Sequence, residues 1–228
     1  MVAEQPDTPK PSSPEPNSPL PRGRHDIPAE EVERHQRDRV VAAVATVMAE
    51  RGYGGLTVER VIALARVSRT TFYRHFGNKR EAVIGSHEQI FARFLASIED
   101  ACPPQADWAE KVKAGIGATL DFAVAQPAQA QLLAAGFLAA DLALARRVQV
   151  SYDQLAALLA EGRRLHTEAA SLPALTEQAL VGAIATILAR GLIGEGSRPL
   201  ADLHSQLTQF ALIPYLGMAE AERVVASA

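Results

Sequence analysis

The 228-residue chain has only one cysteine, Cys102, and its six histidines are scattered without metal-ligand spacing. A single cysteine cannot form an intramolecular disulfide, and the missing Cys/His cluster excludes the common structural zinc sites. The longest charge-free apolar run near the C-terminus, Ala179 to Ala189, is shorter than the roughly 20 residues that a membrane-spanning helix needs. The first 30 residues contain no apolar segment of the kind that secretory signals carry. We therefore expect a cytoplasmic protein without a metal site and without a membrane partner.

Motifs of the common enzyme classes are also absent or incomplete. His87-Glu88 begins like a two-histidine zinc helix, but Phe91 stands where the second histidine is required. Gly115-Ile116-Gly117 lies in a helical pattern and not after a strand, so it does not open a dinucleotide-binding fold. No nucleophile elbow is present. The sequence predicts no catalytic residue, no cofactor and no enzymatic activity, with an all-α enzyme as the alternative from a different functional class.

Charge is distributed unevenly, although the net charge is only −3. Residues 33–80 contain ten Lys or Arg and four Asp or Glu, a balance of +6. The rest of the chain contains 13 basic and 22 acidic residues, a balance of −9. Binding to a polyanion requires clustered Lys and Arg, so residues 33–80 are the predicted contact with nucleic acid.

The N-terminal 28 residues hold eight of the 14 prolines, interleaved with Ser, Glu, Gln and Asp. Such a composition buries too little apolar area to offset the entropy of ordering the chain. We expect residues 1–30 to form a disordered tail. Its basic end, residues 22–25, is interpreted as a solvated linker, with a DNA-contacting arm as the alternative.

Three helices are predicted within the basic segment. Apolar residues from Val40 to Met48 recur at helical spacing, and a glycine cluster that begins at Gly52 ends this helix. Thr57 is placed to cap a second helix of about eight residues, and Ser68 to cap a third. Two short helices joined by a tight turn are typical of a helix-turn-helix, whose second helix enters the major groove of DNA. The alternative is a helical hairpin with a solvated, charged face.

The predicted third helix has two different faces. Phe72 and Phe76 lie four residues apart and would pack into the core. The exposed face would carry guanidinium, hydroxyl and phenol groups from Arg69, Thr70, Tyr73 and Arg74. An arginine on such a face can donate two hydrogen bonds to guanine, and a threonine can contact bases or phosphates.

These residues resemble the signature of TetR-family transcriptional regulators. The matching features are the opening of the second helix, a Val-Ser turn, an aromatic pair and a lysine: Thr57, Val67-Ser68, Tyr73, Phe76 and Lys79. The resemblance covers residues 33–83. It implies an all-α homodimer that represses transcription until a small molecule binds. It also implies a DNA-binding domain in residues 31–78 and an effector-binding and dimerisation domain in residues 79–228.

The resemblance further implies which residues contact DNA. Base edges or nearby phosphates would be met by Ser68, Arg69, Thr70 and Thr71. The phosphate backbone would be held by Thr57, Tyr73, His75 and Lys79. Arg74, on the exposed face of the third helix, is a further candidate for contact with DNA. Arg66 stands where the family usually has glycine, in the turn. A non-glycine residue at positive φ costs on the order of 1 kcal/mol, so either the turn is altered or Arg66 contacts a phosphate.

Helical spacing continues to the C-terminus without sustained strand alternation, so the whole chain is predicted to be all-α. A long helix over residues 79–101, capped by Asn78, would join the DNA-binding domain to the rest. In the resemblance the later helices enclose a pocket for a small-molecule effector that is largely apolar. The aromatic candidates for lining it are Phe91, Phe94, Trp108, Phe122, Phe137 and Tyr152. Ordinary core packing is the alternative for each of them.

Two C-terminal segments, residues 173–193 and 200–216, are apolar on most sides. An amphipathic helix needs one packing partner, whereas a helix that is apolar all round must be covered on two sides. We therefore expect a homodimer formed through these segments, which would read a near-palindromic operator. The alternatives are a central helix buried inside a monomer, and a dimeric DNA-binding regulator without any effector.

Overall fold

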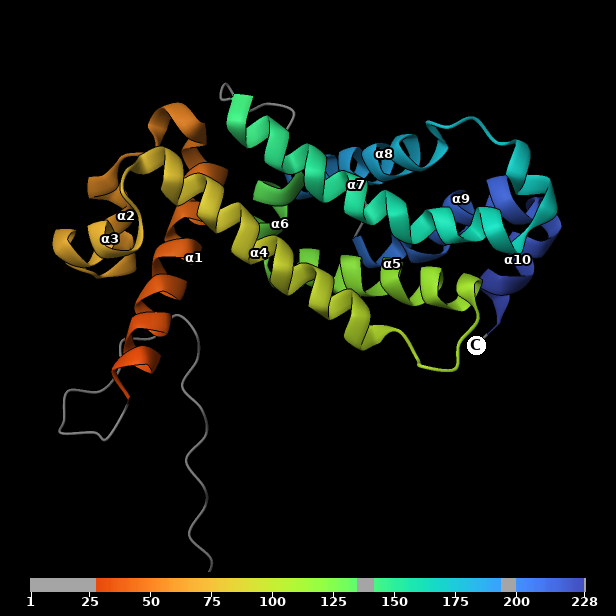
Figure 1. The fold of residues 1–228 in the computed structure, drawn as a ribbon, viewed down its shortest axis with the longest axis horizontal. Coiled ribbons are helices and arrows are strands. Elements are labelled where there is room, and N and C mark those ends of the chain that lie inside the picture. Colours follow the sequence, from red (N-terminus) through yellow and green to blue (C-terminus); the bar gives the residue numbers. More distant parts are fainter. Residues whose placement is uncertain (1–27, 135–141, 194–199, 228) are drawn as a thin grey trace, which may run out of the picture.

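The computed structural model describes residues 28–134, 142–193 and 200–227. Over these ranges the chain forms ten α-helices and two short 3₁₀ segments and has no strand, so the all-α prediction is confirmed. The molecule is elongated, with the N-terminal helices at one end and the C-terminal helices at the other (Figure 1). Most of the predicted tail, including its basic end at 22–25, and Phe137 lie outside the described residues.

The N-terminal part contains α1 (Ala29–Gly55), α2 (Val58–Ala65) and α3 (Arg69–His75). The Thr57 side chain begins α2 by accepting the backbone N–H of Arg60, and Ser68 begins α3 by accepting that of Thr71. Within α1, Gly52 leaves the helical conformation at a φ of 63°, which glycine adopts without the steric cost of a Cβ. The predicted glycine stop is therefore a kink, after which α1 continues to Gly55.

The core of this part is formed by the apolar residues that the sequence placed at helical spacing. Val40 and Val44 of α1 and Phe72 of α3 are fully buried. Leu56 and Val61, which flank the start of α2, are each 1% exposed. Burying side chains of this size contributes about 1.5–3 kcal/mol each, and their common cluster fixes α2 and α3 against α1.

Helix α4 (Lys79–Ala101) connects the two ends of the molecule (Figure 1). Asn78 caps it by accepting the backbone N–H of Glu81, as predicted. Its first turns bury Ala82 and Val83 in the same cluster as the valines of α1. Its later turns bury Phe91 and Phe94 in a separate cluster. One helix is thus packed against the N-terminal part at its start and against the C-terminal part at its end.

The C-terminal part contains α5 (Trp108–Ala125), α6 (Pro127–Ala134), α7 (Leu142–Leu165), η2 (Thr167–Ser171), α8 (Thr176–Ile193), η3 (Leu200–Leu203), α9 (His204–Leu216) and α10 (Met218–Ala226). Asp107 caps α5 and shares a complete capping box with Glu110. Pro127 starts α6, where its missing N–H would have no partner in any case. The apolar segment 200–216 is divided into η3 and α9, and a further helix, α10, follows after Gly217 turns the chain at a φ of 74°.

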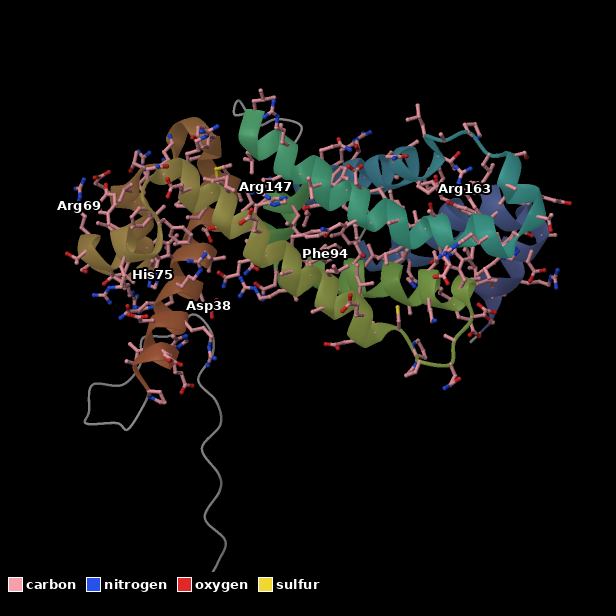
Figure 2. The ribbon with its side chains drawn as sticks, in the orientation of Figure 1. Asp38, Arg69, His75, Phe94, Arg147 and Arg163 are labelled. Atoms are coloured by element: carbon pink, nitrogen blue, oxygen red, sulfur yellow. The ribbon has the colours of Figure 1, made fainter. Side chains whose placement is uncertain are left out.

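A buried ionic network joins α7, α8 and α9. Arg163 and Glu177 form a two-pronged ion pair with N–O distances of 2.6 and 2.9 Å. The same guanidinium donates to the carbonyl of Leu172 at 2.7 Å, and Tyr215 donates to Glu177 at 2.8 Å. These hydrogen bonds, above all the one from Arg163, lower the pKa of the Glu177 carboxyl. Figure 2 shows Arg163 in the C-terminal half of the molecule.

Within the described ranges one helix, α8, is long and apolar enough by length and composition to cross a membrane. The sequence interpretation counted only the charge-free run from Ala179 to Ala189 and so missed it. In the structure α8 contacts α6, α7 and α9. A helix that forms one layer of a bundle meets the same criteria of length and composition as a spanning helix.

Candidate DNA-binding surface and ligand cavity

Helix α3 exposes a polar and basic face at the N-terminal end of the molecule. Its apolar side is buried, with Phe72 at 0% and Phe76 at 4% exposure. The opposite side carries the exposed residues Arg69, Thr70, Tyr73 and Arg74. Figure 2 shows Arg69 at this end, far from the C-terminal helices. Thr71 is half-buried, and its hydroxyl lies 2.9 Å from that of Ser68, so these two predicted contact residues also stabilise the start of α3.

The turn between α2 and α3 depends on Arg66, which adopts a left-handed conformation with φ 52° and ψ 45°. Its N–H bonds to the carbonyl of Ala63, and the N–H of Val67 bonds to that of Ile62. This is the Schellman arrangement, which usually has glycine at the left-handed position. The turn is therefore unaltered, and the exposed Arg66 occupies a strained conformation.

Two arginines of the exposed face are paired with glutamates. Arg69 lies 3.2 Å from Glu59 of α2, and its guanidinium lies 5.8 Å from the centre of the Tyr73 ring. Arg74 lies 3.6 Å from Glu33 of α1. The paired side chains are all more than half exposed, so the pairs contribute little to stability. A phosphate or a guanine can therefore replace the carboxylate at small cost.

Of the residues predicted to hold the phosphate backbone, two are already hydrogen-bonded within the protein and a third is half-buried. Thr57 caps α2. The Lys79 ammonium donates to the carbonyl of Tyr53 at 3.0 Å and lies 4.4 Å from the centre of its ring. His75 is half-buried, and burial together with the nearby Arg37 lowers the pKa of its imidazole, which is neutral at pH 7. These residues surround the exposed face and fix the ends of its helices.

A polar clasp, which no sequence motif indicated, joins α1, α3 and α4. Arg37 of α1 donates to Gln89 of α4 at 3.0 Å, and Gln89 donates to Asp38. The Arg37 guanidinium lies 4.7 Å from the centre of the Phe76 ring and 3.5 Å from the carbonyl oxygen of His75. The clasp therefore holds the C-terminal end of α3 to the middle of α4.

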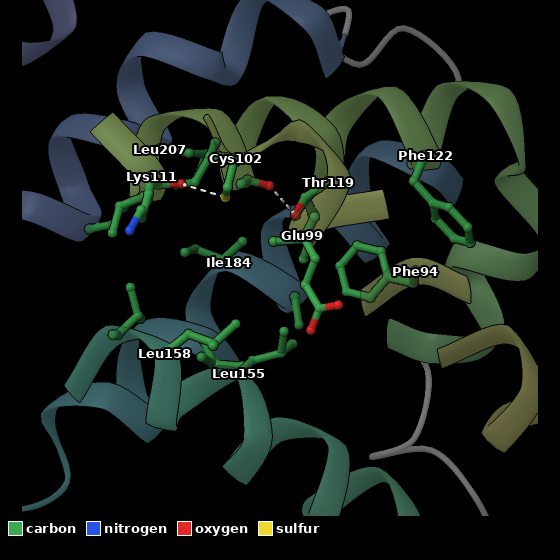
Figure 3. Close-up of a pocket in the computed structure, with 18 of the residues that line it drawn as sticks. Phe94, Glu99, Cys102, Lys111, Thr119, Phe122, Leu155, Leu158, Ile184 and Leu207 are labelled. Atoms are coloured by element: carbon green, nitrogen blue, oxygen red, sulfur yellow. Dashed lines mark hydrogen bonds between the residues drawn. The ribbon is translucent and has the colours of Figure 1, made fainter. Parts of the chain in front are cut away.

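A cavity of about 500 Å³ lies in the C-terminal part, walled by α4, α5, α6, α7, α8 and α9 (Figure 3). This volume is within the range of small-molecule binding sites. Most of the wall is aliphatic, including Ile98, Val112, Ile116, Leu155, Ile184 and Leu188. Figure 3 shows Phe94 and Phe122 together at one end, with ring centres 5.2 Å apart.

Four of the five aromatic residues named for the pocket in the described ranges line this cavity: Phe94, Trp108, Phe122 and Tyr152. Phe91 is not among the wall residues. It packs between His87 and Phe94, with ring centres 6.4 and 6.2 Å away, and is 8% exposed. Phe91 thus lies in the core behind the wall, as the core-packing alternative proposed.

The wall also contains charged or polar residues that the sequence did not connect with a pocket: Glu99, Cys102, Lys111, Thr119 and Glu161. Isolated charged residues on helices are typical of a solvated face, so no local pattern distinguishes them. Only the packing of α7 over α4 and α5 brings them to one cavity.

Residues 40–83 match the family described as bacterial regulatory proteins, tetR family. The matched stretch spans α2, α3 and the adjoining parts of α1 and α4. Residues 40–83 therefore carry the DNA-binding region of the tetR family. The matched stretch contains every residue predicted to contact DNA. A search of the curated proteins gave no match.

Solved structures share the fold of this protein. The fatty acid degradation regulator FadR from Bacillus halodurans is 22% identical, with a TM-score of 0.68 over 77% of this chain and 97% of that one. A TetR-like transcriptional regulator from Rhodococcus sp. RHA1 is 23% identical, with a TM-score of 0.60 over 78% and 95%. The regulator FadR from Bacillus subtilis, in complex with stearoyl-CoA, is 19% identical, with a TM-score of 0.64 over 78% and 97%.

The protein also exposes apolar side chains on α8 and α9. Ile187 and Ile193 of α8 and Phe210 of α9 are 38%, 63% and 41% exposed. A Cβ added at Gly182 would have no atom within 4 Å, so α8 has an open surface at this point. Residues 173–193 and 200–216 are therefore only partly covered within one chain.

Proposed function

We propose that this TetR-family regulator is a homodimeric repressor whose affinity for operator DNA falls when a small, largely apolar molecule enters the cavity. The proposal rests mainly on the path of α4, which extends from the DNA-binding surface to the cavity. It starts beside the DNA-binding surface at Lys79 and contributes Phe94, Ile98 and Glu99 to the cavity wall. A ligand that displaces the end of α4 acts on its first turns and, through the clasp at Gln89, on α3.

On the DNA side, residues 31–78 form the proposed binding domain. Ser68, Arg69, Thr70 and Thr71 read bases or nearby phosphates, and Thr57, Arg66, Tyr73, Arg74, His75 and Lys79 hold the backbone. The balance of +6 in residues 33–80 supports this assignment, because phosphate contacts release counterions and make binding steeply salt-dependent. The exposure of Arg69 at the end of the molecule supports its role in base readout.

On the effector side, residues 79–228 form the proposed ligand-binding and dimerisation domain. The largely apolar wall of the cavity supports an apolar ligand. One structural relative binds stearoyl-CoA, whose acyl chain is apolar, and this is a further reason to expect a ligand with a large apolar part.

The proposed dimer forms through the exposed sides of α8 and α9, which correspond to residues 173–193 and 200–216. Ile187, Ile193 and Phe210 supply apolar area, and Gly182 allows a second helix to approach closely. A two-fold axis through this surface would hold two α3 helices about 34–36 Å apart, as a near-palindromic operator requires.

The test combines sedimentation with DNA binding. The duplex upstream of the protein's own gene is titrated by fluorescence anisotropy, and ten-carbon probes with cationic and anionic head groups are added. We expect a dimer in solution and at least one probe that weakens DNA binding about five- to 150-fold, the usual range of allosteric coupling. Gly182→Arg is expected to give a monomer with lost operator binding, whereas Gln149→Arg on α7 changes neither. Unchanged DNA affinity with a bound probe would indicate a regulator without an effector.

A further inference from the structure

The hydrogen-bond donors inside the cavity are already used by the protein's own backbone. The Thr119 hydroxyl donates to a carbonyl of its own helix at 2.7 Å, and the Trp108 indole donates to the carbonyl of Leu158 at 3.4 Å. The Tyr152 phenol donates to the carbonyl of Ala134 at 3.5 Å, and burial raises its pKa to about 12, so it is neutral at pH 7. An anionic group deep in the cavity would be buried without a donor, which is costly.

The charged groups of the cavity wall, unlike these hydrogen-bond donors, are exposed. Glu99 of α4 and Glu161 of α7 are exposed, and within the described residues neither carboxylate has an ion pair or a hydrogen bond. Figure 3 shows the Glu99 carboxylate directed into the space between α4 and α7. Lys111 is the single cation among the described wall residues. The accessible edge of the cavity therefore has two carboxylates and one ammonium.

The surrounding domain has the same sign of charge. Residues 81–228 contain ten Lys or Arg and sixteen Asp or Glu, a balance of −6. A cavity edge of net negative charge in an acidic domain attracts cations and repels polyanions.

We infer that the effector is a cationic amphiphile, with an apolar body that fills the cavity and a positively charged nitrogen attracted by the carboxylates of Glu99 and Glu161 at the cavity edge. This inference rests on the proposed function, because it names the class of effector that the cavity takes. It separates this chain from the Bacillus subtilis regulator in complex with stearoyl-CoA, whose ligand carries several phosphate charges.

The test uses three probes with the same ten-carbon chain and different head groups: decyltrimethylammonium, decanoate and decanoyl-CoA. Each is titrated below its micelle concentration at low salt, by calorimetry and by the fluorescence of Trp108, the chain's only tryptophan. We expect the cation to bind at least about tenfold more tightly than either anion, and the preference to shrink as salt is raised.

Two variants and a matched control connect the preference to the cavity. Glu99→Gln and Glu161→Gln are each expected to weaken binding of decyltrimethylammonium about two- to fivefold, as exposed ion pairs do. Asp100→Asn removes the same charge from the next residue of α4, which is exposed and is not part of the wall. This control should bind all three probes like the unaltered protein.

Tighter binding of decanoate or decanoyl-CoA, equal affinity for all three probes, or no binding of any of them would overturn the inference. The DNA titration separates this failure from failure of the proposed function. If decanoyl-CoA releases DNA and the cation does not, the proposed function stands and the inference fails. If the cation binds through Glu99 and Glu161 but leaves DNA affinity unchanged, the proposed control of DNA binding by a ligand is wrong. The inference that the cavity binds cationic amphiphiles is then still supported. The Glu99→Gln, Glu161→Gln double variant controls for direct association of the cation with DNA.

Discussion

The side chain of Gln89 on α4 accepts a hydrogen bond from the guanidinium of Arg37 on α1, at 3.0 Å. The same guanidinium lies over the Phe76 ring, which directly follows α3. Gly85 of α4 makes this packing feasible, because a Cβ there would lie 2.8 Å from the Phe76 ring. Movement of α4 therefore cannot leave the C-terminal end of α3 in place.

Replacing Arg37 tests this connection. Arg37→Met removes a hydrogen bond to Gln89, a contact with Phe76 and one positive charge. We expect it to lower the free energy of unfolding by about 1–3 kcal/mol and to weaken DNA binding. Arg34→Met removes the same charge from a side chain that is 72% exposed on α1, and it should leave stability within about 0.5 kcal/mol. Urea unfolding and anisotropy titrations measure both quantities. Equal behaviour of the two variants would mean that the clasp does not position α3.

The strain at Arg66 predicts a trade between stability and DNA binding. Arg66→Gly removes the Cβ at a φ of 52° and should raise the free energy of unfolding by about 1 kcal/mol. Arg66→Ala retains the Cβ and should not gain this stability. Both variants lose the guanidinium, so both should bind every duplex more weakly if Arg66 contacts a phosphate. Thermal unfolding in which glycine and alanine are equally stable would contradict the strain.

Base readout and backbone contact should respond differently to mutation. Arg69→Ala is expected to relax base preference at a cost of about 1–3 kcal/mol for the best duplex. Tyr73→Phe and Lys79→Met should weaken all duplexes about equally, because phosphate contacts carry no sequence information. Glu59→Gln frees Arg69 from its 3.2 Å ion pair and should strengthen non-specific binding. Affinities measured against a library of duplexes distinguish base readout from backbone contact. Unchanged base preference in Arg69→Ala would contradict the assignment.

His87 predicts a dependence of stability on pH. It is 1% exposed, neither ring nitrogen has a hydrogen-bond partner, and burial lowers its pKa from 6.5 to about 4. The unfolded chain therefore takes up a proton between these values and the folded protein does not, so stability falls as pH falls from about 6.5 to 4. Between pH 7 and pH 5 we expect this histidine to account for a loss of about 2 kcal/mol.

Denaturation of His87→Phe across this range measures the effect. The variant should lose markedly less stability between pH 7 and pH 5 than the unaltered protein does. Ser86→Ala changes the neighbouring buried side chain without a titrating group and should retain the full pH dependence. The lowered pKa of Glu177 acts in the range below that carboxyl's usual value, so it does not contribute between pH 7 and pH 5. Equal slopes in all three proteins would contradict the burial of a neutral histidine.

Local signals in the sequence predicted the elements that depend on local chemistry. Thr57, Ser68 and Asn78 each cap a helix as expected, because a cap involves only residues within three positions. The cavity edge could not be predicted in this way. Glu99 and Glu161 lie on different helices and line one cavity only because α7 packs over α4. The same limit explains why Phe91 was wrongly expected in the cavity wall. Its spacing places it on the inner face of α4 but does not show whether it reaches the cavity or stays in the core.

The separation of charge between the two ends of the molecule gives it a permanent electric dipole along its length. Residues 33–80, which form one end of the molecule (Figure 1), carry +6, and residues 81–228 carry −6. The electric field of DNA orients such a molecule before contact, so that α3 faces the DNA in most collisions. In the proposed binding mode, the acidic C-terminal helices do not contact the operator but increase the rate of productive encounters, because they reduce the number of wrong orientations.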